Sequence, residues 1–468
     1  MNGGGSPTVL NAAAQTSPRD DIATVSARLE RLPFTRWHAR ALGIVGAAHF
    51  FDAFDALTIA FVLPVLIEKW KLAPGAAAGV IAIGYVGQVI GAIAFGRAAE
   101  TFGRMRTLRW AIALLSVFTL FSGLATGVVG FVLLRFVQGI GLGGETPVGA
   151  AYVNEICPAR WRGRAVFGLQ MIFAFGVMVT ALAALWIIPV LGWRAMFVIG
   201  AGPLLLALVL PRILPESPRW LAGQGRGVEA GEILSRIEHD LALRSVVLLD
   251  LKPVALPHGS GKTSFVELLR GGYAPRTIGL WITALCTSIA GYGIVIWMPT
   301  LYRTVFHLPL DQALRYGFAT TFASFLGVFV ATLLIDRIGR RHLFMLGFGG
   351  GALPLLYLAA SGVAIGAFYT MVLATVGCCF LSFLLAGLYV YSPEIYPTRI
   401  RATGTGMASA WLRAGAIGGP LLVGAILPSF GIAGVFSLFA GAAVVGAVTI
   451  MWLGVETLGR SLEQIAPR

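Results

Sequence analysis

YVNEICPARWR, at residues 152–162, recurs as YSPEIYPTRIR at residues 391–401, and this internal repeat is the feature that predicts the fold. A second motif, GRAAETFGRMR at 96–106, recurs in the same way as TLLIDRIGRR at 332–341. The two motifs are unrelated, yet their copies are separated by nearly equal distances of 239 and 236 residues. Such offsets indicate a duplicated chain whose second half repeats the first in the same direction.

Long apolar runs surround both motif pairs and are typical of a membrane protein. The 468 residues are 57% hydrophobic and 12% charged, whereas soluble domains are about 25% charged. A helix needs about 20 apolar residues to cross a hydrocarbon layer of roughly 30 Å. We therefore predict an all-α membrane protein with twelve transmembrane helices in two six-helix halves. The runs lie near 41–67, 76–96, 108–126, 128–153, 165–190, 193–211, 277–301, 313–335, 343–361, 363–391, 402–427 and 430–453.

These runs divide the chain into five predicted parts. They are an N-terminal tail at 1–40, a six-helix bundle at 41–211, a linker at 212–276, a second six-helix bundle at 277–453 and a C-terminal tail at 454–468. The linker contains VEAGEILSRIEHDLALR at 228–244, whose helical periodicity places the charges on one face. We therefore expect short helices in the linker.

Lys and Arg are distributed unevenly between alternate loops. If both termini are cytoplasmic, the inward segments hold 28 of the 35 Lys and Arg residues, and the outward loops hold five. Cytoplasmic loops of membrane proteins carry such an excess of positive charge. The asymmetry predicts that both termini are cytoplasmic, and it explains the net charge of +14 without a nucleic-acid partner.

Two glycine-containing stretches resemble nucleotide-binding motifs but lack the surroundings that those motifs need. HGSGKTS at 258–264 has Leu256 where a phosphate loop needs its first Gly. GIGLGGE at 139–145 lies inside an apolar run with no preceding strand, so close helix packing through small residues explains it better. The sequence contains no paired cysteine spacing, metal-ligand cluster or nucleophile triad. We therefore expect no cofactor, no metal and no enzymatic activity.

The few acids inside the apolar runs are candidates for proton coupling, since a charge at the bilayer centre costs roughly 2.5–3.5 kcal/mol. Asp52 and Asp55 lie about 11 and 14 residues into the first run, close to the midplane, and His49 precedes Asp52 by one turn. Neighbouring carboxylates in a low dielectric hold a proton readily. We predict proton coupling by His49, Asp52, Asp55 and Glu145. The alternative is that one Asp only pairs with an Arg to hold the helices together.

Arg413 is the candidate for binding a substrate carboxylate. It lies about 11 residues into the eleventh run with no acid nearby in that run, and its planar donor fork fits a carboxylate. The alternative is a salt bridge to Asp52 or Asp55, and the two arrangements are compatible with two states of one cycle. Arg135 lies nearer the outer face, where we expect it to snorkel.

Further substrate contacts are expected from polar and aromatic residues in the runs. An aromatic ring substrate would stack on them, although core packing is the alternative for any single aromatic. The predicted substrate contacts, besides Arg413 and Asp55, are Gln88, Gln170, Tyr85, Tyr292, Trp297 and Tyr389.

The loop motifs, together with PESPRWL at 215–221 and ETLGRSLEQI at 456–465, resemble those of the sugar porters and their relatives in the major facilitator superfamily. Within that group, FDAFDALTIAFVLPVL at 51–66 and LRAGAIGGPLLVG at 412–424 resemble bacterial nicotinate transporters and aromatic acid:proton symporters. The seventh run reads CTSIAGYGIVIW where a sugar porter would carry a Gln-Gln and Asn signature, which argues against a sugar.

This resemblance implies proton-coupled uptake of a small organic acid, with nicotinate preferred, by alternating access. It implies a monomer in a bacterial inner membrane whose partners are lipid, protons and the substrate. Symport of another organic ion, an aromatic acid or a sugar is the alternative, as is a transporter-like sensor.

The charged residues at the inward ends of the runs are expected to control opening rather than to bind substrate. In the transporters that the chain resembles, such groups latch the two halves together in the outward-open state, and a network that breaks on opening biases a two-state equilibrium. The predicted gating residues are Glu100, Arg104, Glu155, Arg162, Asp336, Arg340, Glu394 and Arg401.

Overall fold

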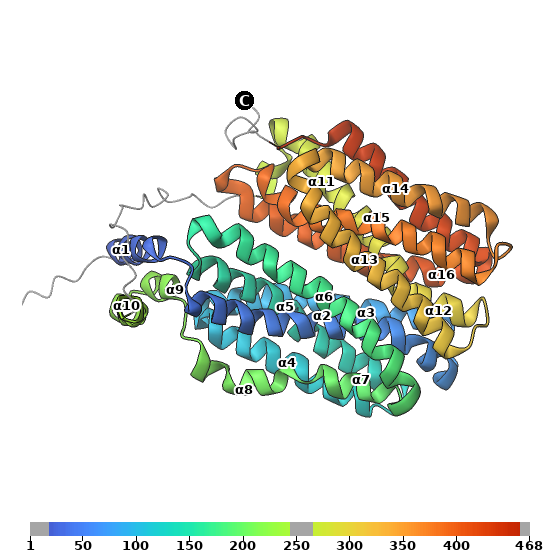
Figure 1. Cartoon of the computed structure of the whole chain (residues 1–468), viewed down its shortest axis with the longest axis horizontal. Helices are drawn as coiled ribbons and strands as arrows, with labels where there is room; N and C mark the ends of the chain where they lie inside the picture. The colour runs from blue at the N-terminus through green and yellow to red at the C-terminus, as the bar shows by residue number, and fades with distance from the viewer. Residues whose placement is uncertain (1–17, 244–264, 459–468) are drawn as a thin grey trace, which may run out of the picture.

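The structure, a computed structural model, describes residues 18–243 and 265–458 of the chain. Within these residues the chain is helical and forms no strand (Figure 1). Eleven helical segments in the described part are long and apolar enough to cross a membrane, and the last of them crosses twice. The predicted all-helical fold with twelve crossings is therefore confirmed. The phosphate-loop look-alike at 258–264 lies outside the described residues.

The first six crossings form the lower bundle in Figure 1. Five of them are single helices, α2 (Arg36–Trp70), α3 (Pro74–Phe102), α4 (Arg104–Leu124), α5 (Val128–Ile156) and α6 (Ala159–Leu191). The sixth is broken into α7 (Trp193–Gly200) and α8 (Pro203–Ile213). The break precedes Pro203, which has no backbone N–H to continue the helix.

The other six crossings form the upper bundle in Figure 1. The first of these consists of α11 (Ala274–Thr287), a single π-helical turn η3 (Ser288–Tyr292) and α12 (Gly293–Thr304). It follows two short 3-10 turns, η1 (Phe265–Leu269) and η2 (Gly271–Tyr273). The next helices are α13 (Leu310–Ile338), α14 (Arg340–Ser361), α15 (Gly366–Glu394) and α16 (Thr398–Leu453).

The 56 residues of α16 form two crossings rather than one. As a straight helix they would span roughly 80 Å, more than twice the thickness of the hydrocarbon layer. Gly431 interrupts the helix with a φ of 60°, a conformation that glycine adopts at little cost. The eleventh and twelfth crossings therefore meet at this residue.

Equivalent glycines begin the third helix of each half. Gly103 and Gly339 precede α4 and α14 with φ values of 100° and 87°. Glu216 accepts a hydrogen bond from the first backbone N–H of α4 (2.9 Å), and Glu456 accepts the equivalent bond from α14 (3.0 Å). A carboxylate at this position satisfies free N–H groups and lies at the positive end of the helix dipole. The duplication seen in the sequence thus includes the contacts of Glu216 in PESPRWL and of Glu456, the first residue of ETLGRSLEQI.

Helices α3 and α5 pack closely through the glycines of the GIGLGGE stretch. A Cβ added at Gly139 would overlap the backbone oxygen of Gly84, and one added at Gly143 would overlap that of Gln88. Small residues allow such close helix approach in membranes. The stretch is therefore a packing surface, as the sequence indicated, and Glu145 lies at its end.

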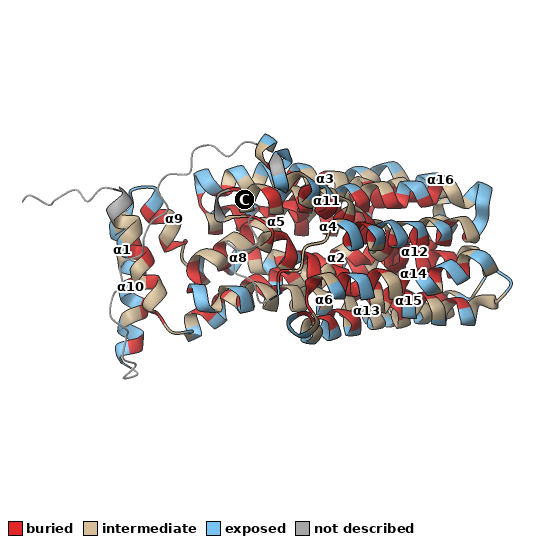
Figure 2. Cartoon of the chain, turned by 90° about the horizontal axis from the view of Figure 1, so that it is seen from above, coloured by how far each residue is buried: buried red, intermediate tan, exposed pale blue. Residues whose placement is uncertain are grey.

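Three helices outside the crossings form a small bundle at one end of the molecule (Figure 2). They are α1 (Pro18–Arg31), α9 (Pro218–Gly223) and α10 (Gly227–Ala242), and α10 matches the helix predicted in the linker. Arg28 and Arg31 both bind Glu238 at 2.8 Å. Burial alone would raise the pKa of Glu238, but the two guanidinium groups hold it below its ordinary value.

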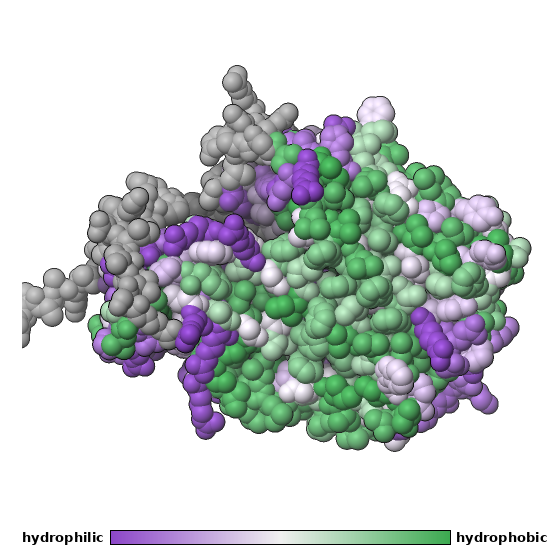
Figure 3. Space-filling view, in the orientation of Figure 1, coloured by the Kyte–Doolittle hydropathy of each residue, from purple (hydrophilic) through white to green (hydrophobic). Residues whose placement is uncertain are grey.

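The surface of the crossings suits a lipid environment. Large apolar side chains are exposed along them, including Trp186, Val190 and Trp452, which are 72–78% exposed. In Figure 3 green hydrophobic residues cover the middle of the molecule, and purple hydrophilic residues gather at its ends. The two bundles contact each other through α3 with α16, α6 with α13 and α2 with α12.

We predict that Gly143→Ala lowers stability by about 1–3 kcal/mol, because the added methyl group has to push α3 and α5 apart. Thermal unfolding of the detergent-purified protein would measure this. The matched control is Gly96→Ala on α3, where a Cβ meets nothing within 4 Å. Equal melting temperatures for the two variants would contradict the close α3–α5 packing.

Candidate functional site

A cavity of about 940 Å³ separates the two bundles. It runs from Tyr85, Tyr292 and Tyr389, in the middle of the crossings, to Glu155 and Arg401. The latter lie at the basic end, which we define as the end that carries the loops near 97–109, 160–164 and 337–341. The cavity therefore gives access from the basic end to the centre of the protein.

At the opposite end the bundles are joined. Arg303, at the end of α12, forms an ion pair of 3.0 Å with Glu68, at the end of α2. The bundles also pack closely at Gly317 of α13, where an added Cβ would contact both Pro299 of α12 and Phe61 of α2. If the basic end is cytoplasmic, as the loop charges predict, the structure faces inward.

A smaller pocket of about 90 Å³ adjoins the cavity at its central end, near Tyr85, Tyr292 and Tyr389, and residues of both bundles line it. Its position near the middle of the crossings is where substrates bind in transporters with repeated halves. The polar and aromatic residues that line it are His49, Asp52, Tyr85, Gln88, Thr146, Gln170, Phe173, Tyr292, Tyr389, Ser409 and Arg413.

Asp55 is held away from this pocket by an ion pair with Arg135. The distance between Arg135 Nη1 and Asp55 Oδ2 is 3.1 Å, and both side chains are almost fully buried. Gln138 and Thr119 donate hydrogen bonds to the other carboxylate oxygen. The expectation that Arg135 snorkels is therefore wrong, and Asp55 does not line the pocket as a substrate contact. Gln138 was missed by the sequence analysis, although it lies one turn after Arg135.

His49, Asp52 and Glu145 form a second buried cluster, which does reach the pocket through His49 and Asp52. His49 Nδ1 lies 3.3 Å from Glu145 Oε2 and 3.7 Å from Asp52 Oδ2. Thr146, which the sequence analysis did not single out, donates a hydrogen bond of 2.8 Å to Asp52. One ring nitrogen of His49 and one carboxylate oxygen each of Asp52 and Glu145, atoms able to ligate a cation, lie within 4.8 Å of one another. Such a cluster is suited to holding a proton or another cation.

Arg413 faces the same pocket from α16 of the other bundle. Its Nη1 donates a hydrogen bond of 2.8 Å to Ser409 Oγ, one turn earlier. Across residues 18–243 and 265–458 it forms no ion pair with an acid, so the alternative of a salt bridge to Asp52 or Asp55 is not adopted here. A guanidinium group without a carboxylate partner therefore faces a pocket at the centre of the protein.

Five of the six predicted aromatic and amide residues line the pocket, and one does not. Tyr85, Tyr292, Tyr389, Gln88 and Gln170 all line the pocket.

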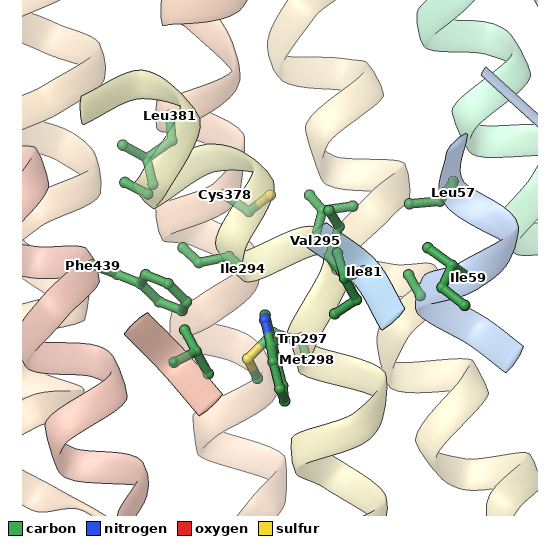
Figure 4. Packing of buried hydrophobic residues seen from close by; sticks show 14 of the residues in the cluster. Leu57, Ile59, Ile81, Ile294, Val295, Trp297, Met298, Cys378, Leu381 and Phe439 are labelled. Atoms are coloured by element: carbon green, nitrogen blue, oxygen red, sulfur yellow. The ribbon is translucent and has the colours of Figure 1, made fainter. Parts of the chain in front are cut away.

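Trp297 does not line the pocket, so this structure gives no support to the predicted substrate contact. It is 1% exposed and packs among apolar side chains, beside Met298 in Figure 4. The π-helical turn before α12 adds a residue to one turn of the helix and so changes which side chains face the cavity. Such a turn has no clear sequence signal.

The charged residues at the basic end pair within each bundle. Arg104 binds Glu155 at 2.9 Å in the first bundle, and Arg340 binds Glu394 at 2.9 Å in the second. Asp336 lies 3.1 Å from Arg340. These equivalent pairs border a cavity that is open in this state. Each pair joins residues of one bundle, so the pairs do not hold the two halves together here as predicted for the outward-open state.

Three other predicted gating residues have different surroundings. Arg162 pairs with Glu30 of α1 at 3.4 Å rather than with Glu155. Arg401 lines the cavity and donates to the backbone oxygen of Tyr396. The Glu100 side chain forms no ion pair within the described residues, and its backbone oxygen instead accepts a bond from Trp220. Glu100 therefore lies outside the charge network in this state.

Comparison with known proteins places the chain among membrane transporters. Residues 65–468 match the family described as sugar (and other) transporter. The niacin transporter NiaP of Acinetobacter baylyi is 33% identical over 448 residues, which cover 94% of this chain and 98% of that protein. The inner membrane metabolite transport protein YdjE of Escherichia coli is 28% identical, with coverage of 94% and 98%.

Among solved structures, the partially occluded inward-open form of the E. coli xylose transporter XylE superimposes with a TM-score of 0.74. The match covers 91% of this chain and all of that chain at 19% sequence identity. At this identity the likeness shows a shared fold.

We predict that Asp55→Asn and Arg135→Gln each destabilise the protein by about 3–5 kcal/mol, because each leaves one buried charge unpaired. The double variant should recover part of this loss. Denaturant unfolding of the purified protein, analysed as a double-mutant cycle, measures the coupling.

The control cycle uses Glu68→Gln and Arg303→Gln, since that ion pair is exposed and worth at most about 1 kcal/mol. Additive effects of Asp55→Asn and Arg135→Gln would contradict the buried pairing.

Proposed function

This chain belongs to the sugar (and other) transporter family of the major facilitator superfamily, and we propose that it imports a small aromatic carboxylate together with protons. Nicotinate is the substrate that we expect. The observation that carries the proposal is Arg413, a guanidinium group without an acid partner in the described residues, facing a small central pocket. The niacin transporter among the relatives supports the same substrate.

An anionic substrate supplies the charge that Arg413 lacks. A partly buried guanidinium group without a counter-ion is costly, and a carboxylate offers two oxygens at the spacing of its donor fork. Ser409 holds one Nη atom and so helps to orient the group toward the pocket. Arg413 is therefore arranged to bind a carboxylate with two parallel hydrogen bonds.

The rest of the pocket suits a single aromatic ring. Its volume of about 90 Å³ is well below the roughly 300–1,000 Å³ of sites for drug-sized ligands. Three tyrosines and Phe173 provide faces and edges for stacking. The amide groups of Gln88 and Gln170 are able to donate a hydrogen bond to a ring nitrogen. Nicotinate combines the three features, since it has one ring, one ring nitrogen and one carboxylate.

A sugar is a poorer fit to this pocket. A neutral sugar leaves Arg413 without a counter-charge, whereas a carboxylate removes that cost. The resemblance to the xylose transporter, at 19% sequence identity, shows a shared fold alone.

We also propose transport by alternating access in a bacterial inner membrane, by a monomer with both termini in the cytoplasm. The cavity that opens at the basic end and the Arg303–Glu68 pair at the other end support one state of such a cycle. The bundles at 41–211 and 277–453 would move as units about the central pocket. The equivalent pairs Arg104–Glu155 and Arg340–Glu394 would then exchange partners across the halves.

We predict that Arg413→Lys weakens nicotinate binding by roughly 10- to 150-fold, because Lys keeps the charge but loses the planar fork. Isothermal titration calorimetry with the purified protein measures this. Nicotinamide lacks the anion, so it should bind the wild type poorly and be little affected by the substitution.

Arg315→Lys is the control, since Arg315 is an exposed cation far from the pocket. Near-normal nicotinate affinity in Arg413→Lys, or equal binding of the acid and the amide by the wild type, would remove Arg413 from the substrate site.

A further inference from the structure

We propose that His49, Asp52 and Glu145 form a binding site for one divalent transition-metal ion such as Zn²⁺, and that the bound ion blocks transport. The site lies between α2 and α5, at the edge of the central pocket. The set is not recognisable in the sequence as a metal-ligand cluster, because Glu145 lies 96 residues from His49. The inference does not require the proposed substrate.

The three side chains present ligand atoms at nearly the spacing that a tetrahedral ion needs. Zn²⁺ binds nitrogen and oxygen at roughly 2.0–2.2 Å, which places neighbouring ligand atoms roughly 3.3–3.6 Å apart. His49 Nδ1 lies 3.3 Å from Glu145 Oε2 and 3.7 Å from Asp52 Oδ2. All three atoms lie within 4.8 Å of one another. Rotation of the two carboxylate groups is therefore enough to close them around an ion.

The cluster is short of positive charge. Asp52 and Glu145 are 4% and 1% exposed, and across residues 18–243 and 265–458 neither forms an ion pair with a Lys or Arg. A protonated His49 balances only one of two ionised carboxylates, and an uncompensated buried charge is costly. With His49 neutral, the two carboxylates carry two negative charges, which a divalent ion cancels.

One carboxylate oxygen of the cluster lacks a partner. Glu145 Oε1 is buried and accepts no hydrogen bond within the part of the chain that the structure describes. A buried polar atom in this condition costs free energy and calls for an explanation. A carboxylate is able to bind a metal through both oxygens. An ion next to Oε2 would therefore satisfy Oε1 as well, which a proton on His49 does not do.

Helix packing does not explain the acid at position 145. The duplicated motif relates the two halves by 239 residues, which makes Leu384 of α15 the equivalent of Glu145. Leu384 is fully buried, so the equivalent helix packs around an apolar side chain at this position. The acid is therefore a feature of the first half that the shared architecture does not need.

Surrounding groups orient the ligands and leave a path to them. Thr146 donates a hydrogen bond of 2.8 Å to Asp52, and the ring of Phe173 lies 5.3 Å from that of His49. Outer contacts of this kind fix the orientation of ligands in metal sites. His49 and Asp52 line the small pocket, which shares three tyrosines with the large cavity. An ion therefore reaches the cluster from the basic end.

The donor set favours a transition metal over the common hard cations. Imidazole nitrogen suits Zn²⁺ and its neighbours in the series, whereas Mg²⁺ needs octahedral oxygen ligands and Ca²⁺ takes about six to eight oxygens. His49, Asp52 and Glu145 are also the residues predicted to carry protons. Because metal ligands have to be deprotonated, a bound ion excludes protons from the cluster. It should therefore stop coupled transport.

The test titrates the purified full chain with Co²⁺, after removal of the affinity tag and treatment with EDTA. One ion per chain should bind and give the intense visible absorption of tetrahedral cobalt. Zn²⁺ should displace the cobalt and remove the bands, whereas Mg²⁺ and Na⁺ should not. The absence of a saturable cobalt spectrum, or equal displacement by Mg²⁺ or Na⁺, overturns the proposal.

Variants assign the ligands. His49→Gln should weaken Zn²⁺ binding by more than about 100-fold, since loss of an outer contact alone costs roughly 10- to 100-fold. Glu145→Gln should act in the same direction and serves if His49→Gln does not fold. His342→Gln is the matched control, because His342 is an exposed histidine beside Glu456. Binding that is unchanged in a folded His49→Gln variant is surface binding only and overturns the site.

The wild type gives two further measurements. X-ray absorption of the zinc-loaded protein should show one imidazole nitrogen with oxygen ligands, and sulfur or a second imidazole would overturn the assignment even if no variant folds. Zn²⁺ on both sides of proteoliposomes should block nicotinate uptake by the wild type and by His342→Gln. Unaffected uptake with the site filled overturns the block. If the protein transports no nicotinate, the proposed function fails, while the cobalt spectrum still decides the metal site.

Discussion

An uncompensated charge is too costly to keep in the middle of an apolar helix bundle, and the centre of this protein is arranged around that cost. Asp55 and Arg135 neutralise each other, and Glu145 lies 3.3 Å from His49. Asp52 and Arg413 remain on opposite sides of a pocket between the bundles. Under the proposed function, a bound carboxylate would supply a charge partner for Arg413.

The separation depends on how the bundles are built. Within the first bundle, glycines bring α3 and α5 into close backbone approach, and Glu145 of α5 lies 3.3 Å from His49 of α2. Between the bundles, contact is made through fewer helices, and the cavity occupies the remaining space. Tight packing inside each half and looser packing between the halves are what the proposed movement of each half as a unit would need. This is the mechanical requirement of alternating access.

The duplicated loops show how the two halves retain matching ends. Glu216 and Glu456 accept hydrogen bonds from the first N–H groups of α4 and α14, each of which follows a glycine. The first residues of these helices, Arg104 and Arg340, form ion pairs with Glu155 and Glu394. The N-terminal helix α1 is a departure from this symmetry, because its Glu30 binds Arg162 and Arg219 at the mouth of the cavity. Only the first half has such a helix in the described residues. The two halves therefore present different charged contacts at the mouth of the cavity, although they arose by duplication.

The sequence by itself determined the number of crossings, the duplication and the depth of Asp52, Asp55 and Arg413, because apolar length and repeat spacing are local properties of the chain. It also indicated five of the six polar or aromatic residues singled out beside Arg413 and Asp55 that line the pocket. It left open which acid would pair with an arginine. Tertiary structure decided that Arg135 binds Asp55, 80 residues away, and that Trp297 turns into the core. Those outcomes depend on how helices rotate against one another when they pack, and one π-helical turn or one close glycine contact is enough to change that rotation without a signal in the local sequence.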